Sequence, residues 1–94
     1  MERLYLVLQS QILELFEAGK VKEVTIERVS LKKWYPVFQI DDEQLGQIAC
    51  SIRVNKEHEL RTWADFLRLL AEFLKDKCGV EECRLNLQST EDSE

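Results

Sequence analysis

The chain has 94 residues, of which 45% are hydrophobic and 33% charged, and its formal net charge at pH 7 is −5. That length corresponds to one small domain, and the hydrophobic fraction suffices for a core, so global disorder is excluded. The acidic balance gives no overall attraction to nucleic acid or anionic lipid, and because no run of about 18 apolar residues occurs, no membrane span is expected.

The N-terminal segment is predicted to form an amphipathic helix over residues 2–18. Leu4, Leu8 and Ile12 recur at helical spacing, and Gly19 stands where a helix often ends. The segment has no small-residue cleavage motif, and the chain has three cysteines, an odd number. These features favour a cytoplasmic protein with free thiols.

Three strands are predicted to follow as a meander. The stretch "VKEVTIERVSL" alternates, with Val24 and Ile26 on one face, and "WYPVFQI" forms a strand that begins near Pro36 or lies at an edge. Residues 47–54 alternate most regularly, after a turn formed by "DDEQLG".

A second helix is predicted from Thr62, the expected N-cap, to Gly79, and "CRLNL" forms a last strand. The element order is therefore α-β-β-β-α-β. It predicts the α+β class, with an antiparallel sheet and both helices packed on one face. Residues 1–88 form a single domain, and residues 89–94 form an acidic flexible tail.

The cysteines raise the question of a metal site. Cys50, Cys78, Cys83 and His58 would just suffice as zinc ligands, but His58 precedes the second helix and Cys78 ends it. The ends of a helix from Thr62 to Cys78 lie about 24 Å apart, so both residues cannot bind one ion unless the chain dimerises. We therefore expect structural cysteines, no metal and no cofactor. The single histidine has no nucleophile at a recognisable offset, so no catalytic residue and no enzymatic activity are predicted.

The first hairpin is a candidate nucleic-acid site. Lys32 and Lys33 are followed directly by Trp34 and Tyr35, and basic residues beside aromatic ones can pair with phosphates and stack on bases. The alternative is purely structural. Two adjacent lysines are equally typical of a solvated turn, and Trp34 is equally typical of an aromatic residue that covers the core.

The second helix is apolar over more of its circumference than one sheet requires. Leu67 and its neighbours can face the sheet, which leaves Trp63, Leu69 and Phe73 as candidate partner-binding residues. The alternative is that the first helix covers them. An uncovered face would indicate a homodimer or another protein partner.

Two stretches resemble the small ParC-type partition-associated proteins of plasmids and integrative conjugative elements. The first opens with "LQSQ" and ends in Ala18-Gly19, and the second runs from Arg61 through Gly79 to the strand Cys83–Leu87. The resemblance implies an accessory role on mobile DNA and carries no catalytic residues. Double-stranded-RNA-binding domains share the α-β-β-β-α order, but they need a basic cluster at the second helix, where "NKEHELRTWAD" is mixed in charge.

We therefore expect a non-enzymatic, cytoplasmic adaptor that is homodimeric and associated with a mobile genetic element. The alternative is a nucleic-acid-binding accessory protein that uses the basic hairpin.

Overall fold

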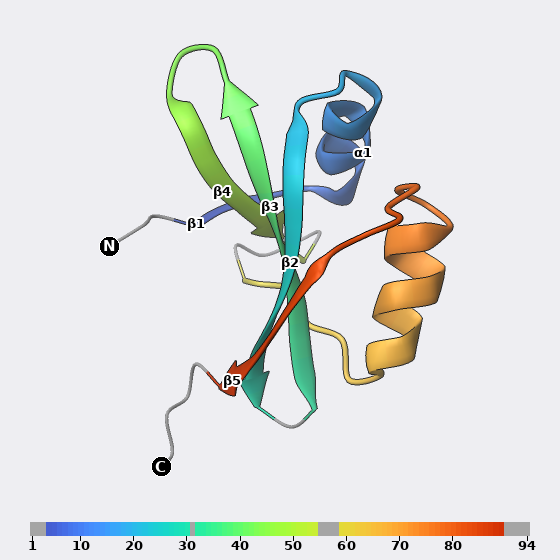
Figure 1. Ribbon diagram of the computed structural model, residues 1–94. Helices are drawn as coiled ribbons and strands as arrows, with labels where there is room; N and C mark the ends of the chain where they lie inside the picture. The colour runs from blue at the N-terminus through green and yellow to red at the C-terminus, as the bar shows by residue number, and fades with distance from the viewer. Residues whose placement is uncertain (1–3, 31, 55–58, 90–94) are drawn as a thin grey trace.

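The computed structural model describes residues 4–30, 32–54 and 59–89 (Figure 1). His58 and most of the predicted acidic tail lie outside the described residues. Five strands and two helices are present, in the order β-α-β-β-β-α-β. The predicted α+β class is confirmed.

The strands form one mixed sheet in the order β1-β4-β3-β2-β5. Its centre is the predicted meander, in which β2 pairs antiparallel with β3 and β3 with β4. The outer strands are parallel to their neighbours, β1 to β4 and β5 to β2, so the prediction of an antiparallel sheet is wrong. The strands are β1 (Leu4–Val7), β2 (Val21–Ser30), β3 (Lys33–Asp42), β4 (Gly46–Ile52) and β5 (Arg84–Ser89).

The predicted first helix is two elements. Its first turn is β1, and α1 spans only Gln9–Glu17. The start of the chain forms a strand because the apolar run Leu4–Val7 pairs with Ala49–Ile52 along β4. Leu8 keeps an extended backbone (φ −74°, ψ 155°), and its N–H donates to Gln11 Oε1 at 2.8 Å where the helix begins.

The second helix begins later than predicted. Trp63 exchanges two backbone hydrogen bonds with Trp34, of 2.7 and 2.9 Å, which holds the segment around Thr62 extended. The Asp65 carboxylate accepts the N–H groups of Leu67 (3.0 Å) and Arg68 (3.3 Å), so Asp65 caps the turn.

The helix that follows, η1 (Arg68–Lys75), is a π-helix. Bonds from the Asp76 N–H to the Ala71 carbonyl and from the Cys78 N–H to the Phe73 carbonyl each span five residues. The π-helix ends at Lys75, before the predicted end at Gly79, and a turn follows it. Gly79 closes this turn with a φ of +75°, and the Val80 N–H donates back to the Leu74 carbonyl at 2.8 Å.

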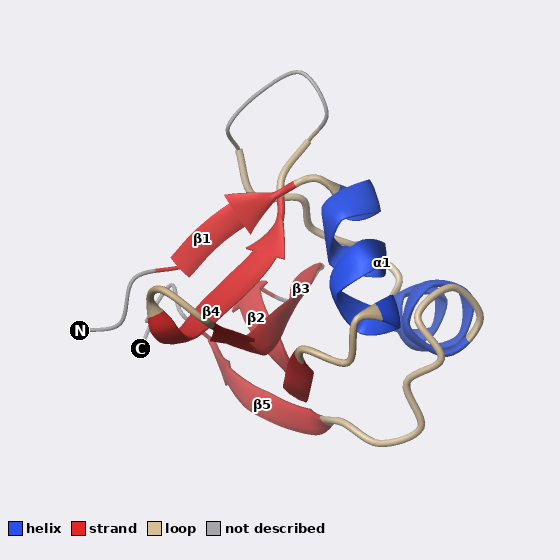
Figure 2. Cartoon of the chain, turned by 90° about the horizontal axis from the view of Figure 1, so that it is seen from above, coloured by secondary structure: helices blue, strands red, loops and turns tan. Residues whose placement is uncertain are grey.

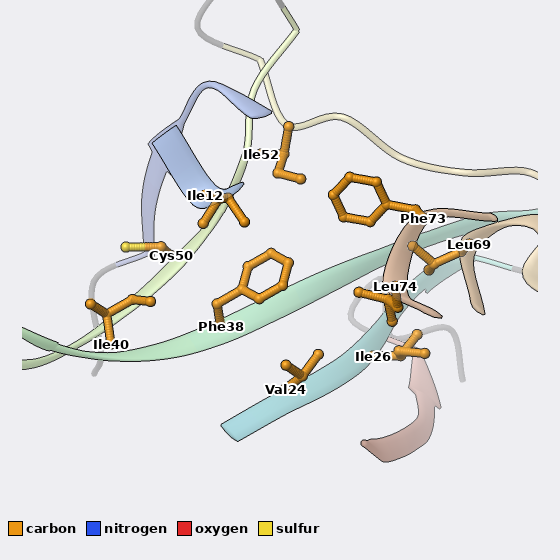
Figure 3. Close-up of a cluster of buried hydrophobic side chains, with 10 residues drawn as sticks. All are labelled: Ile12, Val24, Ile26, Phe38, Ile40, Cys50, Ile52, Leu69, Phe73 and Leu74. Carbon is orange, nitrogen blue, oxygen red and sulfur yellow. The ribbon is translucent and has the colours of Figure 1, made fainter. Parts of the chain in front are cut away.

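Both helices lie on one side of the sheet (Figure 2). Between them and the sheet is the main core, to which α1, β2, β3, β4 and η1 all contribute (Figure 3). Its buried residues are Ile12, Val24, Ile26, Phe38, Ile40, Cys50, Ile52, Leu69, Phe73 and Leu74.

The opposite face of the sheet carries a smaller cluster around Tyr35, Val37 and Ala49, all buried. The buried Ser51 hydroxyl donates to the Pro36 carbonyl at 2.5 Å, which satisfies its hydrogen-bonding group inside this layer.

Candidate functional site

The three cysteines are free and lie apart in the fold. Cys50 is buried in the main core, Cys78 is half-buried after η1, and Cys83 is exposed before β5. Burial raises the pKa of all three thiols, that of Cys78 to about 11, so each keeps its proton at neutral pH. Within residues 4–30, 32–54 and 59–89, no group of three potential metal ligands is found.

The basic hairpin separates the residues that the sequence places together. Lys32 and Lys33 are exposed at the turn between β2 and β3. Trp34 is half-buried, with its ring centroid 4.7 Å from that of Phe66, and Tyr35 is buried on the opposite face of the sheet. The two aromatic rings therefore pack inward, on different faces, while the lysines meet solvent.

The cluster at Trp34 also includes Arg28, whose guanidinium lies 5.6 Å from the Trp34 ring centroid. The desolvated Arg28 Nε has no hydrogen-bond partner in the described part of the chain. Arg28 thus packs as a partly buried cation against an aromatic ring and adds to the lid over this end of the core.

The candidate partner-binding residues on the second helix lie mostly inside the protein. Leu69 and Phe73 belong to the main core, and Trp63 packs with its ring centroid 5.3 Å from that of Phe73. The exposed leucine of this helix is instead Leu67, expected from the sequence to face the sheet. The buried and half-buried positions recur at intervals of three and four residues, and Leu67 lies at the edge of this stripe. They are Phe66, Leu69, Leu70, Phe73 and Leu74.

Leu67 stands at an apolar groove between η1 and the segment that precedes β5, which we call the η1–β5 groove. Figure 1 shows η1 and β5 and the connecting segment that runs from the helix to the strand. The groove has a volume of about 280 Å³ and is lined by Leu67, Leu70, Ala71, Leu74, Lys75, Val80, Glu81, Glu82 and Cys83.

Leu85 is a further exposed apolar side chain, on β5 itself. It is in register with Ile26, whose side chain is buried on the helix-covered face, yet 46% of Leu85 is exposed. The sequence signal for this surface is weak, because Leu67 and Leu85 lie 18 positions apart and each fits an ordinary core pattern.

None of the helices in the described residues is long and apolar enough to cross a membrane. A comparison of the chain with protein-family models, with curated proteins and with solved structures finds no match. The geometry of the surface is therefore the basis for a functional proposal.

Proposed function

We propose that this protein is a non-enzymatic adaptor that acts as a homodimer, and that two copies associate through the η1–β5 groove. The observation that carries the proposal is Leu67, which is 71% exposed at the edge of an apolar groove. An exposed leucine beside an apolar groove supports an interface, because association would remove this apolar surface from water.

The groove is suited to a second copy because it offers both a projecting side chain and a hollow. A twofold axis can place each Leu67 in the groove of the other copy, as in an isologous interface. The rim carries Lys75 on the helix and Glu81 and Glu82 on the segment before β5. The same axis allows these opposite charges to face one another, which favours one orientation.

The position of β5 gives a second reason. It is the last strand of the sheet, so its outer backbone groups face away from β2. Antiparallel pairing of two β5 strands would satisfy these groups.

Association with a mobile genetic element is supported by the resemblance of the sequence to ParC-type proteins alone. The alternative function, nucleic-acid binding through the first hairpin, is supported by the exposed Lys32 and Lys33. We favour the adaptor because Trp34 and Tyr35 already pack within the protein.

Light scattering over a range of protein concentrations tests the dimer. We expect the mass of two chains at tens of micromolar, and we expect Leu67→Asp to raise the dissociation constant by about tenfold or more, since it places a charge in an apolar contact. A monomer throughout this range would rule the proposal out.

Leu45→Asp is the matched control, because Leu45 is 58% exposed and lies in the turn between β3 and β4. It introduces the same charge away from the groove and should leave the dissociation constant unchanged. Equal weakening by both substitutions would indicate a general effect of charge and would contradict the groove as the interface.

A further inference from the structure

A second surface lies where α1 begins and β4 ends. Here a cavity of about 600 Å³ is lined by Arg53 and Arg61, with Gln9 and Ser10 contributing from the first turn of α1. Leu8, Ile52 and Val54 supply its apolar walls. We call this cavity the arginine cleft.

The two arginines are brought to the cleft by backbone pairing. The Arg53 N–H donates to the Val7 carbonyl at 2.9 Å, and the Arg61 N–H donates to the Ile52 carbonyl at 2.8 Å. These bonds attach both residues to the end of the sheet beside α1, although they are eight positions apart in the chain.

Arg61 is held in place by neutral partners. Its Nη1 donates to Gln9 Oε1 at 2.9 Å, and its guanidinium lies 4.4 Å from the Trp63 ring centroid. Among the described residues, neither Arg53 nor Arg61 forms an ion pair with a carboxylate. Since a guanidinium has five N–H donors, most of the hydrogen-bonding capacity of the cleft is not used by carboxylates of the described fold.

The charge continues beyond the cleft. An adjoining cavity of about 240 Å³ shares Gln9 and Arg61 and is also lined by Arg68, Lys77 and Glu72. Together the two cavities carry four basic side chains and one acidic one, in a chain whose net charge is −5. Arg68 is paired with Asp65 at 3.9 Å, so Arg53, Arg61 and Lys77 supply the excess positive charge. This local reversal of sign attracts an anion to a surface that the overall charge disfavours.

We propose that the arginine cleft binds a phosphate-bearing ligand. Guanidinium groups match the oxygens of phosphate in a bidentate manner, and two of them balance a group that carries close to two negative charges better than they balance a single carboxylate. The volume of the cleft lies in the range of small-molecule sites, so it has room for more than the phosphate.

The phosphate has two possible sources, a free nucleotide and the backbone of a nucleic acid. Both present the same group to Arg53 and Arg61. The site is separate from the η1–β5 groove and does not depend on the dimer, so either proposal can fail while the other stands.

Calorimetric titration of the full chain at low salt with pyrophosphate, ATP and a short single-stranded oligonucleotide tests the proposal. We expect binding of at least one probe, weakened about tenfold or more by Arg53→Gln and by Arg61→Gln, because each removes charge-assisted hydrogen bonds. Binding of pyrophosphate or ATP identifies a free ligand as the source. Binding of the oligonucleotide alone identifies a nucleic-acid backbone.

Lys22→Gln is the matched control, since it removes one positive charge from an exposed position on β2 that lines neither cavity of the cleft. It should leave affinity within about twofold. Arg61→Lys keeps the charge without the bidentate fork and should retain part of the affinity. Circular dichroism confirms that each variant is folded.

Three results would overturn the proposal. The first is no binding of any probe, and the second is equal weakening by Lys22→Gln and by Arg61→Gln. The third is tighter binding of a polyglutamate peptide than of every phosphate probe. Leu67→Asp should leave phosphate binding intact, which separates this site from the dimer.

Discussion

The two edge strands of the sheet are both parallel to their neighbours, yet they are held differently. On β1, Tyr5 and Val7 pack against the main core, and α1 follows at once to cover it. On β5, Leu85 is 46% exposed, and the contacts to β2 include exposed polar ones, Arg84 to Glu23 at 2.6 Å and Asn86 to Glu27 at 2.9 Å. Parallel pairing alone does not bury an edge strand, because burial requires a helix packed over it.

The largest expected effect concerns the covered edge. Ile12 on α1 is fully buried, so Ile12→Ala should lower the free energy of unfolding by about 2–5 kcal/mol, through lost burial and the cavity left behind. Leu85→Ala should cost less than about 1 kcal/mol, because Leu85 is already half in solvent. Urea denaturation followed by circular dichroism measures both.

Both variants should be compared at the same low protein concentration, since a dimer would add its own stability. Equal losses for Ile12→Ala and Leu85→Ala would mean that β5 is covered as fully as β1, and would contradict the comparison.

The alkylation rates of the cysteines provide a second comparison of the two edges. Cys50 on β4 pairs with Tyr5 of β1 and is buried, whereas Cys83 precedes β5 and is exposed. At pH 8, iodoacetamide should modify Cys83 about a hundredfold or more faster than Cys50, which must wait for local opening. Cys78, with a pKa of about 11, should react slowly, and faster as pH rises.

Mass spectrometry of the modified peptides gives the three rates. Because Cys83 also lines the η1–β5 groove, its rate should fall as protein concentration rises and the dimer forms. Similar rates for Cys50 and Cys83 would show that the covered edge opens as readily as the exposed one.

The smallest expected effect concerns the polar contacts of β5. Arg84 and Glu23 are both well exposed, so Arg84→Ala should reduce the free energy of unfolding by about 0.2–1 kcal/mol. Salt screens such a pair, so the difference between wild type and variant should shrink as ionic strength rises. Urea denaturation at two salt concentrations measures this effect. A loss of unfolding free energy as large as that of Ile12→Ala would contradict the prediction, because it would mean that this ion pair is the main interaction holding β5 to β2.

The sequence predicts the centre of the fold better than its edges. Val24 and Ile26, and Ile48, Cys50 and Ile52, alternate locally, which is enough to define the strands of the meander. The run Leu4–Leu8 fits a helical stripe as well as a strand. The strand forms because this run pairs with residues 49–52, which lie far away in the sequence. A local pattern of residues does not contain that information.

The candidate surfaces follow the same rule. The sequence shows the width of the apolar face on the second helix, but which part of that face meets the sheet depends on how the helix packs. Leu67 and Leu69 are therefore exchanged relative to the prediction. The arginine cleft combines the start of α1, Arg53 and Arg61, and a sequence pattern does not show that these segments meet. Tertiary contacts, rather than residue spacing, create both surfaces.

The pairing of β5 with β2 also bears on the order in which the chain assembles during synthesis. Strands β1 to β4 and helix α1 all lie within the first 52 residues. Four of the five strands can therefore pair before the C-terminal part of the chain is synthesised. Throughout that interval the outer edge of β2, including Thr25 and Ile26, lacks its final neighbour. We expect this edge to be the point at which nascent chains are most prone to associate wrongly, until residues 84–89 arrive to cover it.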